Sequence, residues 1–478
     1  MTATGIVFIV YLTILIGVGV ATFHLNKTQE DYLLAGRKLG PWVVAFSERA
    51  SGESAWLLLA LPGAAIAIGM GEIWTVIGII SGIILSWFLI ATRLRSETEK
   101  YEALTIPQYL HRKYQDDSNI IRLFSSFIIA FFFAFYVSAQ FHASGKILNS
   151  IFGLNQITGI TIGAVIIVLY TLMGGFFAVA WTDLIQGIIM ICTLVVLPVA
   201  GYIELKEAGV SITETMMNTS ANHTSLTNGL TGWAAVSLII GGLSWGLGYF
   251  GQPHLIIRYM SIRSVGEIKT ARKIATAWAI PGVTGAFLVG IVALAIFGQG
   301  YFTDVEQAMP ILAMHLLPGW VAGIVISGAV AAMMSTADSQ LLVSTSAITV
   351  DFYDRFLKRK LSDKGMVKLS RIVTIGFGVF AYAIAIISEL TGKTIFGVVS
   401  YAWSGLGSSF GPVLILTLWW KKTTRRGVIA GILTGGISTI IWANIEVLHT
   451  AVSERLVSFV LAFIAVIFFS LIDKSSAK

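Results

Sequence analysis

The chain has 478 residues, of which 56% are hydrophobic and only 12% are charged, and its mean hydropathy is +0.82. A soluble domain carries about a quarter charged residues, so this composition excludes an ordinary soluble protein. The net charge of +7 falls mainly in short loops between apolar runs, which is typical of membrane topology and not of nucleic-acid binding. The single cysteine, Cys192, excludes a disulfide framework within the chain.

Apolar runs of about 20 residues, the length that crosses a bilayer as a helix, recur along the whole chain. In chain order they cover about 3–24, 41–69, 72–92, 121–150, 157–178, 181–203, 230–258, 275–299, 318–348, 367–389, 394–420, 425–447 and 454–472. The first run lacks the basic segment and cleavage site of a signal peptide, so we expect it to be retained. The sequence therefore predicts an all-α integral membrane protein with 13 transmembrane helices, forming a single domain over residues 1–478.

Basic residues divide the loops into two sets. One set carries Lys27, Arg37, Lys38, Arg93, Arg95, Lys100, Arg112, Lys113, Arg263, Lys269, Arg272, Lys273, Arg355, Lys358, Arg359, Lys360, Lys364, Lys421, Lys422, Arg425 and Arg426. The alternate loops carry only Lys146, Lys206, Lys393 and Arg455. Because cytoplasmic loops are enriched in Lys and Arg, we expect the N-terminus outside the cell membrane and the C-terminus in the cytoplasm.

The second span contains three charged residues within a short stretch, namely Glu48, Arg49 and Glu53. Each charge at the centre of a membrane helix costs about 2.5–3.5 kcal/mol on insertion scales, so the group needs partners or water. Ser51, Gly52 and Ser54 favour local unwinding, which frees backbone carbonyls to bind a cation and amides to bind a carboxylate. The functional hypothesis is a binding site at a helix break. The alternative is an ion pair between Arg49 and Glu53, at i,i+4 spacing, that serves only packing.

The seventh span is also interrupted, by three glycines and a proline between Ser244 and His254. Trp245 and Tyr249 lie four residues apart and can form one wall of a pocket. The alternative is an aromatic stripe that packs against neighbouring helices in a proline-kinked span. Paired interrupted helices in two halves of a chain favour a transporter whose binding site lies at the membrane midplane.

The ninth span carries several side-chain oxygens, from Ser335, Thr336, Asp338 and Ser339. Hard cations take oxygen ligands, so this stretch is a candidate half-site for an ion. The alternative is hydrogen bonding between helices or to the preceding turn. Asp183 falls near the predicted start of the sixth span, where an aspartate is suited to capping the helix.

Short motifs in a fixed order along nearly the whole chain resemble the sodium/solute symporter family, and its proline-transporting branch in particular. They are Trp56 followed by Leu61-Pro-Gly63, the run from Gly246 to His254, Met334-Ser-Thr336, and Ser400-Tyr-Ala-Trp403 with Gly411-Pro412. The resemblance implies a core of two inverted five-helix repeats, spans 2–6 and 7–11, with broken helices in spans 2 and 7. The first repeat would cover about 41–203 and the second about 230–420, flanked by spans 3–24, 425–447 and 454–472.

The resemblance also implies which residues bind the ion and the solute. The main sodium site would consist of Ala50, Glu53 (main chain), Ala332, Ser335 and Thr336. The solute pocket would consist of Ser54, Ala55, Tyr136, Trp245, Tyr249 and Pro253. A second site, for a cation or a proton, would consist of Asp183, Asp338 and Ser339.

This sequence departs from the proline branch in the second span. The branch has aspartate where Gly52 stands, methionine at Glu53, and small residues at Glu48 and Arg49, which we assign to a coupling network. Ala55 replaces a glycine and adds a methyl group to the pocket wall. Na+ is therefore the expected coupling ion, and H+ carried by a buried carboxylate is the alternative.

These observations predict a secondary active symporter that takes up a small amino acid, with L-proline as the leading solute. Another small amino or carboxylic acid, or a membrane solute sensor on the same fold, remains the alternative. We expect no enzymatic activity, since no nucleophile–base pairing can be read from the sequence, and no organic cofactor. The expected partners are a small-molecule solute and the lipid bilayer, without nucleic acid or an obligate protein partner.

Overall fold

The computed structural model describes residues 2–22, 34–173, 175–353 and 363–473, and it is helical without a β-strand over these ranges. The basic residues Lys27, Arg355, Lys358, Arg359 and Lys360 lie outside the described residues.

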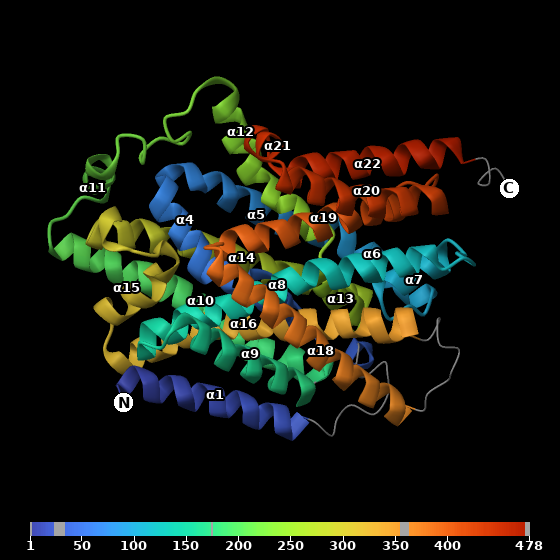
Figure 1. Cartoon of the computed structure of the whole chain (residues 1–478), viewed down its shortest axis with the longest axis horizontal. Coiled ribbons are helices and arrows are strands. Elements are labelled where there is room, and N and C mark those ends of the chain that lie inside the picture. The colour runs from blue at the N-terminus through green and yellow to red at the C-terminus, as the bar shows by residue number, and fades with distance from the viewer. Residues whose placement is uncertain (1, 23–33, 174, 354–362, 474–478) are drawn as a thin grey trace.

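Long helices run roughly parallel to one another in a single bundle (Figure 1). The main helices are α1 (Ala3–Thr22), α3 (Pro41–Ala55), α4 (Leu61–Ile68), α5 (Ile73–Ser86), α8 (Ile120–Phe152), α9 (Gln156–Met173), α10 (Phe176–Glu207), α12 (Gly232–Leu243), α13 (Pro253–Ser261), α14 (Ile268–Phe297), α16 (Gly319–Ser346), α18 (Asp363–Leu390), α19 (Ile395–Trp419), α20 (Arg425–Asn444) and α22 (Glu454–Ile472). Short helices connect them: α6 (Thr92–Lys100), α7 (Ile106–Lys113), α11 (Ile212–Thr219), α15 (Ala308–Leu316) and α21 (Glu446–Ala451).

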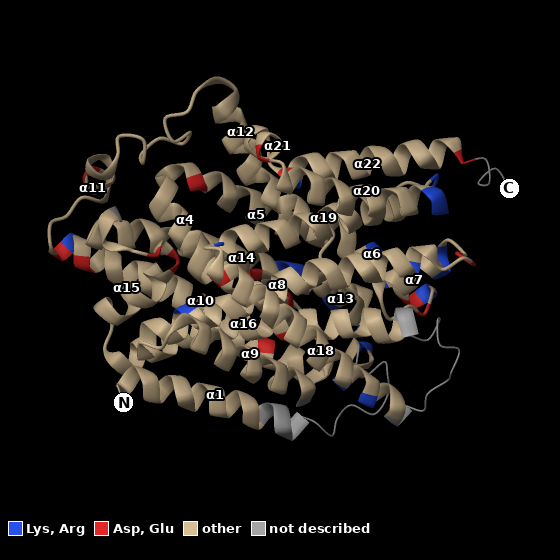
Figure 2. Cartoon of the chain, in the orientation of Figure 1, with Lys and Arg blue, Asp and Glu red and all other residues tan. Residues whose placement is uncertain are grey.

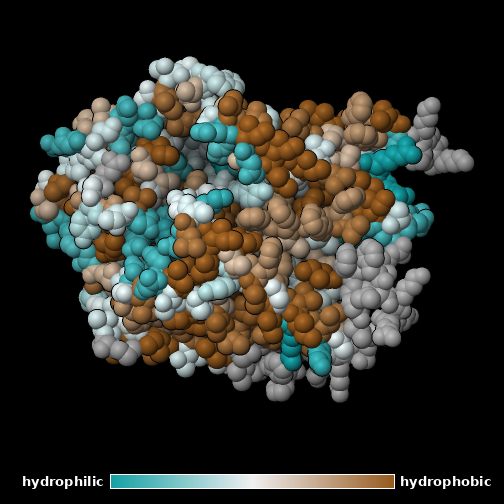
Figure 3. All heavy atoms as spheres, in the orientation of Figure 1, coloured by the Kyte–Doolittle hydropathy of each residue, from teal (hydrophilic) through white to brown (hydrophobic). Residues whose placement is uncertain are grey.

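The all-α membrane class is confirmed. Among the described residues, nine helical segments are long and apolar enough to cross a membrane, and the shorter apolar helices Ala3–Gly17 and Gln156–Leu172 accompany them. Figure 3 shows a broad hydrophobic band across the bundle, with hydrophilic residues gathered toward its two ends. Many large apolar side chains on the outer helix faces are exposed, as lipid contact requires. The count of 13 spans stays a prediction.

Helix α1 begins and helix α22 ends at opposite ends of the bundle, as an odd number of crossings requires (Figure 1). Lys and Arg gather around α7 and the start of α20, near the C-terminal end (Figure 2). This distribution agrees with the loop pattern in the sequence. The side that faces the cytoplasm stays a prediction.

The predicted start of the sixth span is wrong. The sixth span was expected to begin near residue 181, but α10 begins at Phe176, directly after Gly175 in extended conformation. Asp183 therefore lies two turns inside α10 and does not cap it. Its side chain is fully buried, so a different partner must satisfy its charge.

Both predicted helix interruptions are confirmed. Helix α3 is broken at Ser54, whose φ of 40° and ψ of −170° leave the helical region, and a wide π-type turn over Trp56–Ala60 leads into α4. Helix α12 passes into a tighter 3-10 segment, η6 (Ser244–Phe250), and the chain then breaks before Pro253 starts α13. The glycines and the proline of the sequence account for the second break, since they disfavour a continuous helix.

Glycine brings α5 and η6 into backbone contact. A Cβ added to Gly82 would lie 2.3 Å from the carbonyl oxygen of Gly246 and 2.4 Å from its Cα. Only hydrogen at both positions permits this approach, which fixes the broken seventh span against the third. The close contact thus holds η6 in place beside α3.

We expect Gly82→Ala to destabilise the protein by about 1–3 kcal/mol, because the methyl group meets backbone and not a flexible side chain. The thermal midpoint of purified protein, followed by tryptophan fluorescence, measures the effect. Gly376→Ala in α18 is the matched control, since a Cβ there meets nothing within 4 Å. Equal midpoints for the two variants would contradict this account of the α5–η6 contact.

Candidate functional site

Oxygen atoms of α3 and α16 meet next to the break in α3. The Ser335 hydroxyl donates to the carbonyl oxygens of Ala50 (3.0 Å) and Ala332 (3.1 Å), and the Thr336 hydroxyl donates to Ser51 O (2.9 Å). All of these residues are buried. The cluster offers only neutral oxygen donors, which is the donor set that a hard monovalent cation takes, so these residues fit Na+.

Four of the five predicted sodium ligands are thus brought together, namely Ala50, Ala332, Ser335 and Thr336. The carbonyl oxygen of Glu53, the fifth, accepts a hydrogen bond from Trp56 N–H beyond the break. Ser51 was not predicted as a ligand, although its carbonyl oxygen lies beside Thr336. The pairs Ser335–Ala50 and Thr336–Ser51 each join two helices 285 residues apart in sequence, and the fold shows the hydrogen bonds between them.

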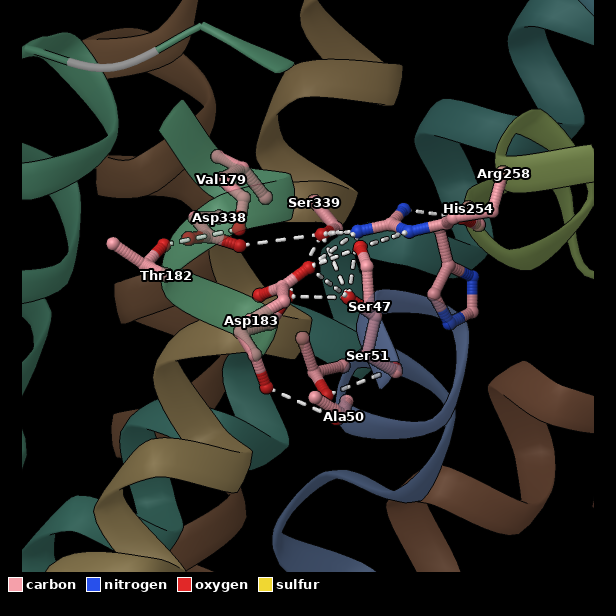
Figure 4. Close-up of polar contacts among 12 residues, drawn as sticks. Ser47, Ala50, Ser51, Val179, Thr182, Asp183, His254, Arg258, Asp338 and Ser339 are labelled. Atoms are coloured by element: carbon pink, nitrogen blue, oxygen red, sulfur yellow. Dashed lines mark hydrogen bonds and ion pairs between the residues drawn. The ribbon is translucent and has the colours of Figure 1, made fainter. Parts of the chain in front are cut away.

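A second polar cluster lies around Asp183, where α10 faces α3, α13 and α16 (Figure 4). One carboxylate oxygen of Asp183 accepts hydrogen bonds from Ser47 Oγ (2.6 Å) and Ser51 Oγ (3.2 Å). The same oxygen lies 3.1 Å from a guanidinium nitrogen of Arg258. Ser51 Oγ also lies 3.0 Å from Ser339 Oγ. Asp183 and Ser339 of the predicted second site therefore lie together around an arginine, and Ser339 Oγ also donates to Asp338 Oδ1 at 3.2 Å.

Arg258 is a residue of this cluster that the sequence interpretation missed. It lies at the predicted end of the seventh span, where a basic residue looks like a loop anchor, yet it is fully buried on α13. Its Nε donates to Ser47 Oγ (3.1 Å), Nη2 donates to Ser51 Oγ (2.6 Å) and Ser339 Oγ (2.5 Å), and Nη1 donates to His254 O. The sequence did contain a signal for Arg258, because the two carboxylates Asp183 and Asp338 lie in apolar spans and need a buried cation to balance their charge.

The three charges of the second span form one buried network. Arg49 pairs with Glu48 and, at 2.5 Å, with Glu53, and none of the three side chains is exposed. Trp87 Nε1 donates to Glu48 at 3.2 Å, and the Tyr249 hydroxyl donates to Glu53 at 3.4 Å. The i,i+4 ion pair between Arg49 and Glu53, expected from their spacing, is confirmed. The other carboxylate oxygen of Glu53 accepts the hydrogen bond from Tyr249 of η6.

Aromatic side chains surround the break in α3 on its other side. Trp245 stacks on Trp56 with ring centroids 5.4 Å apart, and Tyr249 meets the edge of Trp403 at 4.7 Å. The Tyr136 hydroxyl lies 3.5 Å from Ser54 Oγ, and its ring lies 6.3 Å from that of Trp403. Such a wall suits a small solute with an apolar body.

The structure brings most of the predicted solute pocket together. Ser54, Ala55, Tyr136, Trp245 and Tyr249 lie around the break, and the freed Ala55 N–H donates to Gln140 Oε1 at 3.1 Å. Pro253 lines a crevice together with residues such as Thr105, Met260 and Ala347.

Trp56, Gln140 and Trp403 were missed as site residues. Gln140 is a buried amide in an apolar helix, which is a readable signal. Trp403 lies on α19, and no sequence pattern links that helix to η6.

The broken helices, the oxygen cluster and the aromatic wall define a class, the helical membrane transporters whose site lies where two interrupted spans meet. A Na+-coupled sialic acid symporter, solved in a substrate-bound outward-open state, shares the fold with a TM-score of 0.82 at 20% identity, covering 99% of this chain and 98% of that one. A nucleobase-cation-symport-1 family transporter superposes with a TM-score of 0.55 at 13% identity, covering 93% and 96%.

The chain belongs to the sodium:solute symporter family, whose model matches residues 32–435. The high-affinity proline transporter PutP of Bacillus subtilis is 39% identical, covering 96% of both chains. The sodium/proline symporter of Escherichia coli is 37% identical, covering 98% of this chain and 93% of that protein. The osmoregulated proline transporter OpuE of Bacillus subtilis is 36% identical, covering 99% and 95%. The chain is therefore a multi-pass membrane symporter and not an enzyme.

Proposed function

We propose that this chain takes up L-proline, driven by an inward sodium gradient across the cell membrane. The observation that carries the proposal is the buried oxygen cluster of Ala50, Ala332, Ser335 and Thr336 directly beside an aromatic-walled helix break. The names of relatives at 36–39% identity over nearly the full chain support proline as the solute and sodium as the ion.

Two inverted repeats, about 41–203 and 230–420, are proposed to move against each other around these sites, with spans 3–24, 425–447 and 454–472 at the periphery. The sodium site joins α3 of the first repeat to α16 of the second. An ion between them stabilises the conformation in which these helices touch. The sodium ion drives transport only because it binds that conformation more tightly than the other. A tenfold difference in sodium affinity between the two conformations corresponds to about 1.4 kcal/mol.

The solute is proposed to bind on the other side of the break, against Trp245, Tyr249 and Tyr136. The backbone leaves the helical conformation at Ser54, and an interrupted helix of this kind is suited to binding the carboxylate and the amine of an amino acid. The charged network of Arg49 and Glu53 touches the same wall through Tyr249, which favours another small amino acid or carboxylic acid as the second candidate.

The test is uptake of radiolabelled L-proline into proteoliposomes that contain the purified chain. An inward sodium gradient is imposed in one arm, and an inward proton gradient at equal sodium in the other. Sodium-driven accumulation above equilibrium is expected. Accumulation driven by the proton gradient alone would show that the coupling ion is H+ and not Na+. Absence of proline uptake in both arms would exclude proline as the solute, and a competition screen of small amino and carboxylic acids would follow.

We expect Trp245→Ala to raise the KM for proline at least about tenfold, because truncating a buried aromatic wall removes roughly 2–3 kcal/mol of contact. Concentration-dependent uptake in proteoliposomes measures the change. Trp320→Ala on α16 is the matched control, since that side chain is 59% exposed. An unchanged KM for proline in Trp245→Ala would contradict the proposal that the solute binds against Trp245.

A further inference from the structure

The cluster around Asp183 contains its own cation. Arg258 approaches it from α13, and its guanidinium contacts side chains of α3, α10 and α16 (Figure 4). The contacts are to Ser47, Ser51, Asp183 and Ser339, and all lie within 3.1 Å. The guanidinium carbon also lies 5.1 Å from the ring centroid of Phe176, which adds a cation–π contact.

These contacts use the oxygens that a free cation would need. Nη2 alone lies on Ser51 Oγ, Ser339 Oγ and Asp183 Oδ2. An ion bound to the same three oxygens would lie against the guanidinium and be repelled by it, strongly so in a buried site. The residues of the predicted second site therefore do not fit a mobile cation while Arg258 is in place.

We infer that Arg258 is a tethered cation that fills the second cation position, so that the chain binds a single sodium ion, at the cluster of Ser335 and Thr336. The inference rests on the proposed sodium coupling. It also explains the charge of the cluster, because the carboxylates of Asp183 and Asp338 are both fully buried and require a buried counter-charge. Arg258 supplies that charge from α13, within 3.1 Å of Asp183.

The geometry further implies that removing the arginine charge opens the site. Asp183 Oδ1 and Asp338 Oδ2 are buried without a hydrogen-bond partner in the described structure. Together with the hydroxyls of Ser51 and Ser339, they would offer oxygen ligands to a sodium ion once the guanidinium is absent. Arg258→Met removes the charge and keeps much of the side-chain volume.

The experiment is saturation binding of radioactive sodium to the purified full-length chain, without solute, counted as ions per chain. The wild type is expected to bind one sodium ion, and Arg258→Met is expected to bind one more. Arg258→Lys keeps the charge and should match the wild type, whereas Arg258→Met with Asp183→Asn should lose the extra ion. Tryptophan-fluorescence melting confirms that each variant is folded. Arg258→Gln also removes the charge, keeps a polar side chain for the serine hydroxyls, and is expected to bind the additional ion if Arg258→Met is unstable.

Two sodium ions in the wild type, or the same number in wild type and Arg258→Met, would overturn the inference. Absence of sodium binding in the wild type would instead refute the sodium part of the proposed function. In that case an ion gained by Arg258→Met would still support the tethered cation, and no gain would overturn both.

Discussion

Ser335→Ala and Thr336→Ala are each expected to raise the sodium concentration for half-maximal proline uptake by about tenfold or more. The Ser335 hydroxyl lies 3.0 Å from Ala50 O and 3.1 Å from Ala332 O, so its loss removes one oxygen from the centre of the proposed ion site. A hydrogen bond or ligand contact to a charged group is worth about 1.5–3 kcal/mol, and about 1.4 kcal/mol corresponds to tenfold in affinity.

The matched control is Ser327→Ala on the same helix. Its buried hydroxyl donates only to Gly323 O, one turn back, at 2.8 Å. It therefore tests the loss of a serine from α16 without touching the cluster. Sodium dependence that is equally altered in Ser327→Ala, or unaltered in Ser335→Ala and Thr336→Ala, would refute the ion site.

Arg49→Met should have the largest effect on stability. Glu48 and Glu53 would then be left as two buried carboxylates without their cation, and breaking such a pair costs about 3–5 kcal/mol. A typical domain is stable by only about 5–15 kcal/mol, so a large fall in the thermal midpoint and in the yield of monodisperse protein is expected. Fluorescence-detected size exclusion and tryptophan-fluorescence melting measure both.

The triple variant Glu48→Gln, Arg49→Met, Glu53→Gln removes all three charges while preserving side-chain volume. Replacing a complete buried ion network is often close to neutral, so this variant should recover most of the stability lost in Arg49→Met. Its sodium-driven uptake then decides between the two hypotheses for the second span. If the triple variant takes up proline with wild-type sodium dependence, the network serves only packing. If the variant is folded but its uptake no longer depends on sodium, the network is part of the transport mechanism.

The contrast between the two arginines shows how far sequence reasoning reaches. Arg49 is recognisable as a buried charge because it lies in the middle of an apolar run, and its partner Glu53 is one turn away. Arg258 lies at the edge of such a run, where basic residues normally mark the membrane boundary. Its partners come from three other helices, so no local spacing could predict that it is buried.

The sequence by itself determined the membrane class, the positions of the apolar helices, the breaks near Ser54 and before Pro253, and the residue types of the sites. Hydropathy, glycine content and charge inside apolar runs are local properties, and they fix local structure directly. The family resemblance had assigned Ser335 and Ala50 to one site, and the tertiary structure showed the hydrogen bond between them. Only the tertiary structure decided that Ser51 O meets Thr336 and that Trp403 completes the aromatic wall. It also decided that Asp183 faces Arg258, because residues about 75 to 285 positions apart become neighbours only when whole helices pack.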